Sequence, residues 1–514
     1  MPKQTDVAKI ANCVAELMLY AEKKLSLNPD DGVYVRNLLL AELKVPEPEE
    51  PAVTCRPIQT VLDEITDYAV RKKLTTEQEK LLFETKIMGI LTPMPSAVIK
   101  NFDDVAAESG VKAATKYLFD LSVANNYIRK VDIDKNIGWE VPTEKGSVKI
   151  TINLAKPEKD PKAVLAASKA PQTNYPKCPL CVENVGWWGN LQKPARQTLR
   201  AVPLFLNDEK WWLQFSPYVY FDNHCICFSD EHRPMHLDVN SFKRMADFVD
   251  TFPHYFIGSN APLPIVGGSI LAHDHYQGGA KVLPEMKTAY LKKFRHPDFE
   301  GVTAGIADWY NSVVRIEGSD AEKVIALTNH VFETWKTYSD KTVDILAFTD
   351  ETPHNTVTPV AQKTDDGNYR FDLILRNNRT DEKHPYGIFH PTEDMHNIKK
   401  EAIGIIEVMG LFILPGRLAK EAVEIRKYLT GETPLNFKEL SDPEHPLFKH
   451  VGMIAQLAND NGLNLSEGEA GDVITDYINK TCIKILETTA VFKADQKGRK
   501  AFDRFMTKCG FEEE

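Results

Sequence analysis

Long hydrophobic runs, dense cysteine and runs of basic residues are all missing from this chain of 514 residues. No stretch approaches the roughly 18 consecutive apolar residues that a membrane-spanning helix needs, so we expect no membrane span. The first residues lack the charged and then apolar build of a secretory signal peptide. Eight cysteines are too sparse for a disulfide scaffold in a chain of this length. Together these absences predict a soluble cytoplasmic protein.

The balance of charge excludes another class of partner. Acidic and basic residues are intermixed, and the formal net charge is −11. A protein that binds nucleic acid through its phosphates concentrates Lys and Arg on one surface, so we expect no nucleic-acid partner. An anionic small substrate remains compatible, because a local cluster of Arg, Lys or His matters more than the total charge.

Hydrophobic periodicity predicts a mixed architecture. Apolar residues spaced three and four apart predict helices over much of residues 1–130 and again near the C-terminus. Alternating residues predict strands at 146–154, 354–362 and 369–377, the last two joined by the turn Asp365-Asp366-Gly367. The length predicts about two to four structural units. We expect an α+β fold in four regions: a helical region 1–145, a first half 146–290, a second half 291–430 and a helical extension 431–514.

The stretch Pro264–Gly279, PIVGGSILAHDHYQGG, carries the densest chemistry of the chain. If Ile270–Gln277 forms a strand, side chains alternate, so His273, His275 and Gln277 share one face. The glycines on either side let backbone approach a ligand closely, which is typical of phosphate sites. The alternative is a surface strand with two unrelated histidines. Seven of the fourteen histidines fall between residues 178 and 296, which favours a functional site.

A histidine in such a motif can act as a covalent nucleophile toward phosphorus. The attacking nitrogen must be unprotonated, and a hydrogen bond at the other ring nitrogen enforces that state. Gln277 and Ser269 are candidate donors to the phosphoryl oxygens. Glutamine cannot act as a general acid or activate water at neutral pH. The site therefore suits a leaving group that needs no proton, such as a sugar phosphate, and suits transfer over hydrolysis.

A second motif, Cys178-Pro-Leu-Cys181, places two thiols within reach of one metal ion. One such motif is half of a zinc site, and His232 and His273 are candidates for the other two ligands. The alternative is a pair of free cysteines without metal.

Several blocks of the chain resemble the galactose-1-phosphate uridylyltransferases, members of the wider histidine-triad superfamily. HDHYQGG resembles the active-site strand, CPLCVEN the metal-binding motif, and CFSDEH the strand that ends in a zinc-ligand histidine. LFLND and GSN resemble nucleoside- and phosphate-contacting segments. HNTVTPVA, LRNN and HPTEDMHNIKKEAIGIIEVMGLFILPGRL resemble the second, bacterial type of the family. With these blocks the resemblance covers nearly the whole chain.

The resemblance implies a histidine-triad-like fold, with antiparallel sheet domains in two related halves. It also implies uridylyl transfer from UDP-glucose to galactose 1-phosphate, a nucleotidyltransferase reaction of galactose metabolism, with His275 as the nucleophile. Residues 146–290 would be the catalytic half, residues 291–430 the hexose-binding half, and the protein a homodimer. The implied zinc ligands are Cys178, Cys181, His232 and His273. The implied substrate contacts are Gln277, Ser269, Asn260, Asn207 and Asp208, with Arg196, Arg200 and Glu407 as further candidates.

Two departures and two alternatives accompany this interpretation. Asp274 stands between the histidines where the commoner type has proline, and Tyr276 follows His275 where that type has glycine. The nearest alternative function is a related nucleotidyltransferase or phosphorylase acting on another nucleotide-sugar. The other is a zinc-stabilised module that binds a nucleotide without chemistry.

Overall fold

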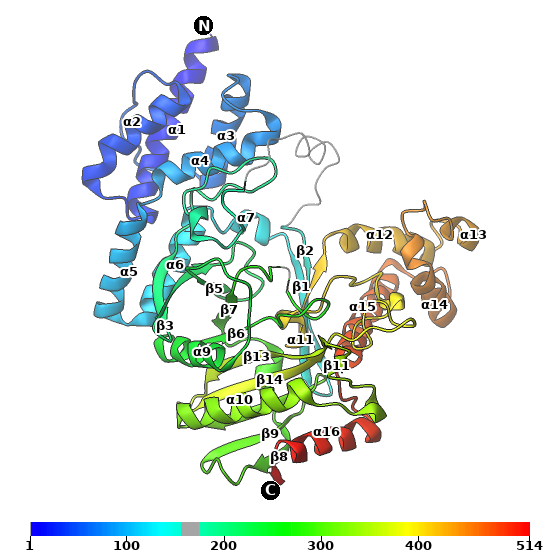
Figure 1. Ribbon diagram of the computed structural model, residues 1–514. Helices are drawn as coiled ribbons and strands as arrows, with labels where there is room; N and C mark the ends of the chain where they lie inside the picture. The colour runs from blue at the N-terminus through cyan, green and yellow to red at the C-terminus, as the bar shows by residue number, and fades with distance from the viewer. Residues whose placement is uncertain (1, 156–173, 269) are drawn as a thin grey trace. The chain divides into compact units, whose positions relative to one another are not determined.

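The computed structural model describes residues 2–155, 174–268 and 270–514 (Figure 1). The chain divides into two compact units. Of the described residues, unit 1 holds 2–134, 174–219 and 223–233, and unit 2 holds 135–155, 220–222 and the rest of the chain from 234. Ser269, a predicted phosphate contact, lies outside the described residues. The expected division into four regions stays a prediction.

Unit 1 begins with helices, as the periodicity predicts. In α3, the apolar residues Val61, Leu62 and Ile65 are fully buried because they fall on one side of the helix. In α1, Val14 and Leu17 are buried in the same way, and the two helices pack together. The helices are α1 Pro2–Lys24, α2 Gly32–Leu43, α3 Ile58–Arg71, α4 Lys80–Leu91, α5 Pro95–Ser109, α6 Val111–Ala124 and α7 Lys130–Ile133.

Three antiparallel strands complete unit 1: β3 Val202–Leu206, β4 Glu209–Phe215 and β5 Cys225–Ser229, paired in the order β3-β4-β5. Leu206 pairs with Glu209, so only Asn207 and Asp208 form the turn between β3 and β4. Both have positive φ, at 50° and 60°. A two-residue hairpin turn of this kind favours Asn and Asp, which tolerate the left-handed region.

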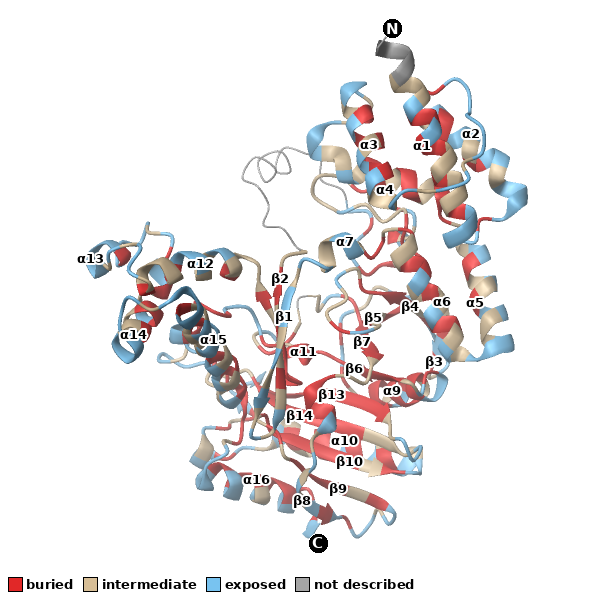
Figure 2. Ribbon diagram, turned by 180° about the vertical axis from the view of Figure 1, so that it is seen from behind, coloured by how far each residue is buried: buried red, intermediate tan, exposed pale blue. Residues whose placement is uncertain are grey.

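Unit 2 contains a run of antiparallel strands in the order β16-β8-β9-β10-β14-β13-β6-β7. Their bounds are β6 Tyr255–Gly258, β7 His275–Ala280, β8 Tyr290–Arg295, β9 Val302–Ala307, β10 Val313–Gly318, β13 Asn355–Lys363, β14 Tyr369–Asn377 and β16 Glu512–Glu513. The hairpin of β13 and β14 confirms the strands and turn expected from the sequence. Both strands are buried along most of their length (Figure 2), which indicates that other residues of the protein cover both faces.

Helices α9 Val239–Thr251 and α10 Ala321–Thr337 cover one face of these strands (Figure 1). Phe242 of α9 packs edge-on against Phe371 of β14. Phe371 pairs with Ala361, Ala361 with Ile257 and Ile257 with Gly278, so these four residues share the helix-covered face. The neighbouring row, which ends at Gln277, therefore lies on the opposite face.

A second sheet of unit 2 joins β1 Ile137–Thr143, β2 Gly146–Asn153 and β15 Leu411–Pro415, with β15 parallel to β2. The strand expected at 146–154 is thus confirmed. One apolar cluster joins this sheet to the C-terminal helices and includes Ile150, Phe412 and Ile425. Those helices are α11 Ile405–Val408, α12 Arg417–Leu429, α13 Phe437–Leu440, α14 Val451–Asn461 and α15 Glu467–Thr489, and the last helix of the chain is α16 Gln496–Lys508.

The expected α+β fold class is confirmed, but one expected strand is shifted. The strand predicted at Ile270–Gln277 begins only at His275 and runs to Ala280. Leu271 instead lies in a turn, where its carbonyl accepts a hydrogen bond from the backbone N–H of Met235. His273 is therefore not held on the His275 face by strand alternation. In the described part of the chain, no helix has the length and apolarity to span a membrane.

Glu421 of α12 generates a prediction about stability and pH. It accepts hydrogen bonds from Arg417 at 2.6 Å, from Lys449 at 2.7 Å and from the buried His450 at 3.0 Å. Burial alone would raise the pKa of Glu421, but the hydrogen bonds from His450 and Lys449 and the charge of Arg417 lower it to about 2. A lowered pKa adds stability above the unfolded value, and this stability is lost as pH falls toward the folded value.

We expect Glu421→Gln to cost about 1–2 kcal/mol of unfolding free energy at pH 7, after allowing for solvent screening. The difference from the parent should shrink as pH falls from 5 toward 2. Urea unfolding midpoints across this range measure it. Glu424→Gln, on the same helix with an exposed Lys427 partner, is the matched control and should change little. A difference that stays constant with pH would contradict the assignment.

Candidate active site and metal-ligand cluster

His275 begins β7, and its ring is held in one orientation. The Nδ1 atom lies 2.8 Å from the carbonyl oxygen of His273. A carbonyl only accepts hydrogen bonds, so Nδ1 carries the hydrogen and donates it. In the neutral ring the other nitrogen, Nε2, then keeps its lone pair. This is the state that a nucleophilic histidine requires.

The surroundings of His275 also favour the neutral ring. The residue is only 5% exposed, and burial lowers its pKa to about 4. The hydrogen bond to the His273 carbonyl opposes this shift, and the charge of a protonated His273 would add to it. At neutral pH the imidazole is therefore uncharged, so its nucleophilic form is the resting form.

Gln277 follows His275 on the same face of β7 and is half-buried. Its strand partner is Gly258 of β6, two residues before Asn260. Asn260 is buried, and its Oδ1 accepts a hydrogen bond of 3.1 Å from the backbone N–H of Ile405. The structure thus places Gln277 in the strand that carries His275, and Asn260 two residues past the end of the neighbouring strand.

The group of possible metal ligands in the described residues consists of Cys178, Cys181, His232 and His273, the same four that the sequence predicts. The first three lie in unit 1, where their ligand atoms are within 4.8 Å of one another. The two Sγ atoms are 3.5 Å apart, and Cys181 Sγ is 3.1 Å from His232 Nδ1. His273 lies in unit 2, two residues before the nucleophile candidate.

Asn184 holds the CxxC turn in shape. Its side-chain amide donates to the carbonyls of Cys178, at 2.8 Å, and Cys181, at 2.7 Å. Two thiolates on one tetrahedral zinc ion, each about 2.3 Å from the metal, lie roughly 3.7 Å apart. The observed thiol separation is close to this value, so the cluster could bind a metal ion with little rearrangement.

The predicted nucleoside contacts form the turn between β3 and β4, in which Asn207 is half-buried and Asp208 exposed. Of the two arginine candidates, Arg196 is half-buried, with its guanidinium over the Tyr127 ring at 5.5 Å. Arg200 is buried and donates four hydrogen bonds to backbone carbonyl oxygens. Two of these oxygens belong to Thr92 and Pro93. This geometry gives Arg200 a structural task, and its role as a phosphate partner stays a prediction.

Glu407, the candidate hexose contact, is also engaged within the chain. Its Oε1 pairs with Lys399 Nζ at 2.9 Å, and its Oε2 accepts the backbone N–H of Gly404 at 3.1 Å. Its hexose role likewise stays a prediction. The sequence did not single out Lys399 or Arg376, although Arg376 lies in the LRNN block. Arg376 is a charged residue within the strand predicted at 369–377, and this position could have marked it as a candidate site residue.

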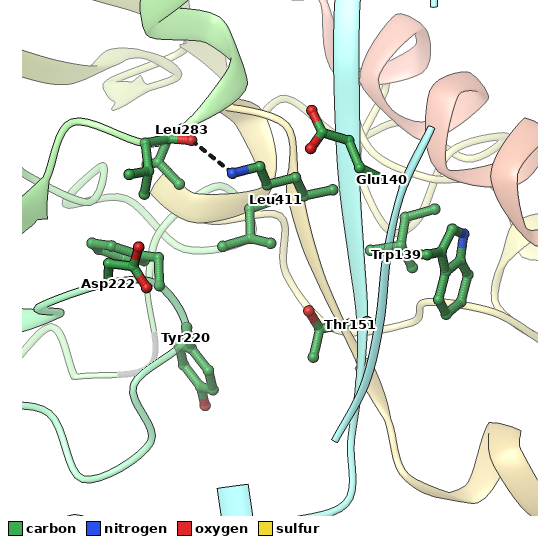
Figure 3. Close-up of a pocket in the computed structure, with 12 residues that line it drawn as sticks. Trp139, Glu140, Thr151, Tyr220, Asp222, Leu283 and Leu411 are labelled. Atoms are coloured by element: carbon green, nitrogen blue, oxygen red, sulfur yellow. Dashed lines mark hydrogen bonds between the residues drawn. The ribbon is translucent and has the colours of Figure 1, made fainter. Parts of the chain in front are cut away.

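A cavity of about 330 Å³ lies elsewhere in unit 2, between β1, β2 and the segment 220–222 (Figure 3). Lys149 reaches across one side and donates to the Val282 carbonyl at 3.2 Å. The Asp222 carbonyl accepts the backbone N–H of Ala280, which places the cavity at the end of β7 opposite to His275. Among the residues that the structure describes, no predicted site residue lines it.

Comparison with known proteins gives two family matches. Residues 26–234 match the model described as galactose-1-phosphate uridyl transferase, N-terminal domain, and residues 248–442 match its C-terminal domain. The first match contains the CxxC motif and His232, and the second contains His273, His275 and Gln277. The two family domains together cover most of the chain.

Relatives named galactose-1-phosphate uridylyltransferase match nearly the full length. The protein of Caldanaerobacter subterraneus subsp. tengcongensis is 46% identical and covers 97% of this chain and 98% of its own. That of Bacillus subtilis is 43% identical, covering 96% and 97%, and that of Fusobacterium nucleatum is 42% identical, covering 98% and 99%. The crystal structure of a yeast Ap4A phosphorylase aligns at 11% identity and a TM-score of 0.30, too low to support an argument. It covers 60% of this chain and 88% of its own. The chain belongs to the galactose-1-phosphate uridylyltransferase family.

Proposed function

We propose that this protein transfers a uridylyl group from UDP-glucose to galactose 1-phosphate, releasing glucose 1-phosphate and UDP-galactose. The reaction proceeds in two displacements through a uridylyl group bound to His275. The observation that carries the proposal is the ring of His275, buried, neutral and hydrogen-bonded at Nδ1 to the His273 carbonyl. Family membership and the names of the full-length relatives support it.

In the first displacement, the Nε2 lone pair attacks the α-phosphorus of UDP-glucose and forms a P–N bond. The bond from phosphorus to the bridging oxygen breaks, and glucose 1-phosphate leaves with the electron pair. In the second displacement, a phosphate oxygen of galactose 1-phosphate attacks the same phosphorus, and the P–N electrons return to Nε2. The second step is the reverse of the first with a different sugar phosphate, so one site serves both.

The leaving group in each step is a phosphate, which is stable as an anion at neutral pH and needs no proton. The residue facing it therefore needs to donate a hydrogen bond without titrating. Gln277 supplies a side-chain amide of this kind, and Asn260 and Ser269 are proposed as further donors to phosphoryl oxygens. Such donors stabilise the charge that develops on the phosphoryl oxygens in the transition state.

We assign the metal ligands to Cys178, Cys181, His232 and His273, and the metal to zinc. Two cysteines and two histidines are a common structural donor set for zinc, and the spacing of the three unit 1 ligands supports the assignment. When bound, the ion would supply no chemistry of its own beyond fixing its ligands. His273 is two residues from His275, and its carbonyl holds the His275 ring, so a fixed His273 orients the nucleophile.

The remaining assignments complete the proposal. Asn207 and Asp208 contact the nucleoside, Arg196 a phosphate, and Glu407 the hexose. The protein acts in the cytoplasm as a homodimer. These roles rest on the resemblance of sequence blocks to the family.

Replacing the nucleophile tests the mechanism directly. We expect His275→Ala to abolish exchange of labelled glucose 1-phosphate into UDP-glucose, because no other group can form the P–N bond. His236→Ala, an exposed histidine of the same unit, is the matched control and should retain exchange. The parent incubated with labelled UDP-glucose should yield an acid-labile uridylyl adduct at His275. Full turnover by His275→Ala would contradict the mechanism. The absence of an adduct on the parent protein would favour a binding module.

Placing a titratable side chain at position 277 tests the proposed role of Gln277 as a neutral hydrogen-bond donor. We expect Gln277→His to transfer less and to release free UMP, since histidine can act as an acid and activate water. Gln277→Met removes the amide without adding an acid, so it should lose transfer and gain no hydrolysis. Product analysis by ion-exchange chromatography separates these outcomes. Unchanged transfer with no UMP from the histidine variant would undercut the argument.

Metal removal tests the cluster independently of activity. We expect about one zinc ion per chain in the purified protein and its loss in Cys178→Ser, because serine is a poor zinc ligand. The variant should also melt at a lower temperature. Elemental analysis and thermal unfolding measure both effects. Cys55→Ser, outside the cluster, should keep its metal. Full zinc content in Cys178→Ser would rule out the assigned ligand set.

A further inference from the structure

The segment Ile403–Glu407, here called the 403–407 segment, contacts Asn260 through the backbone. Ile405 is the first residue of α11, and its N–H donates to Asn260 Oδ1 at 3.1 Å. The first N–H groups of a helix have no partner within the helix, so this one is available to a side chain. Ile405 is 2% exposed and Asn260 5% exposed. The hydrogen bond is therefore shielded from water.

This contact determines which end of the Asn260 amide can donate. An N–H group bonds only to the oxygen end, so Nδ2 occupies the other end. Gly268 packs against that end: a Cβ atom on Gly268 would lie 2.4 Å from Nδ2 and 2.8 Å from Cγ. No side chain fits there without displacing the amide. The Ile405 N–H thus holds the oxygen end of the amide, and on the nitrogen side only a glycine at position 268 leaves room for it.

Asn260 follows the strand that pairs with β7, which carries His275. Gly258, the last residue of β6, pairs with Gln277, so Asn260 lies two residues beyond this pair on one chain segment and His275 two residues before it on the other. The backbone N–H of Ser259 donates to the Pro359 carbonyl at 3.0 Å, so regular pairing with β13 continues past the end of β6. An extension of the register with β7 by two residues would set Asn260 opposite His275, which is the arrangement that the proposed phosphate contact requires.

Two buried groups hold the 403–407 segment in place. Arg376 of β14 is 1% exposed and donates from Nη2 to the Ile403 carbonyl at 2.8 Å. Its Nη1 lies 3.4 Å from Thr358 Oγ1, on the strand next to it. At the other end, Glu407 joins the Gly404 N–H to Lys399 Nζ. Arg376 can hold the segment in this way without touching a substrate.

We propose that the 403–407 segment orients the Asn260 amide so that Nδ2 donates to a phosphoryl oxygen, and that Arg376 is a positioning residue for this segment. The inference rests on the proposed function, in which Asn260 contacts the phosphate. It adds that two hydrogen bonds fix the orientation of the Asn260 amide: Arg376 holds the Ile403 carbonyl, and the Ile405 N–H of the same segment holds Asn260 Oδ1. Loss of any link leaves the amide free to rotate, which weakens the transition state more than the ground state.

The Ile405 N–H can be removed almost alone. Proline lacks this hydrogen and is tolerated at the first helical position. Ile405→Pro and Ile405→Ala both lose the buried side chain, but only the proline variant loses the N–H. We expect kcat/KM for uridylyl transfer to be about 10- to 100-fold lower in Ile405→Pro than in Ile405→Ala, less than the roughly 10²- to 10³-fold cost of removing a transition-state donor, because the amide remains and loses only its orientation. Equal values in the two variants would overturn the proposal.

Arg376 is tested by a double-mutant cycle with Asn260. As a single substitution, Arg376→Gln should lower kcat/KM, mainly through kcat. Added to Asn260→Ala, it should lower kcat/KM little further, because Arg376 acts only through the Asn260 amide. Arg370→Gln, on the same strand with its guanidinium on Asp372, is the matched control and should be additive with Asn260→Ala. Additive effects for Arg376, or an Arg376→Gln chain that unfolds, would show a merely structural role.

The outcomes separate this inference from the function on which it rests. If His275→Ala retains transfer, the proposed function fails. If His275→Ala is inactive but Asn260→Ala transfers normally, the function stands and the inference fails. If Ile405→Pro does not fold, as judged by circular dichroism, the cycle between Arg376 and Asn260 decides the question.

Discussion

The burial of one face of the unit 2 strands beneath α9 and α10 is the constraint on which the candidate site depends. The row that ends at Gly278 packs toward these helices, with Phe371 against Phe242. Side chains of a strand alternate, so Gln277 and His275 must point to the other face. A slip of one residue would bury the polar pair under the helices, which the cost of burying unpaired polar groups forbids.

On that second face, backbone groups rather than other side chains orient the chemistry. The His273 carbonyl selects the tautomer of His275, and the Ile405 N–H selects the orientation of Asn260. Backbone donors and acceptors move less than side chains, because the surrounding secondary structure fixes them. Orientation is thereby in place before a substrate binds, which is the form in which hydrogen-bond donors contribute most to catalysis.

The proposed site joins contributions from distant parts of the sequence. Asn260 follows β6, and the residues that hold it come from β14 and from the 403–407 segment. The CxxC cluster stands in unit 1, with Asn184 shaping its turn. A sequence motif shows each group separately. Only packing shows that the buried Arg376, which donates to the Ile403 carbonyl and to Thr358, supports the 403–407 segment and through it the Asn260 amide.

The sequence by itself determined the α+β class, the hairpin of β13 and β14 and the cysteine pair of the possible metal-ligand group. These features follow from local periodicity, turn chemistry and the spacing of ligand residues, which need no knowledge of packing. It misplaced the start of β7, because whether residues 270–274 extend or turn depends on Met235, far away in the chain. The engagement of Arg200 and Glu407 within the chain was hidden for the same reason. Tertiary structure alone decides which polar atoms already have partners, because the partners of a buried group come from wherever the fold brings them.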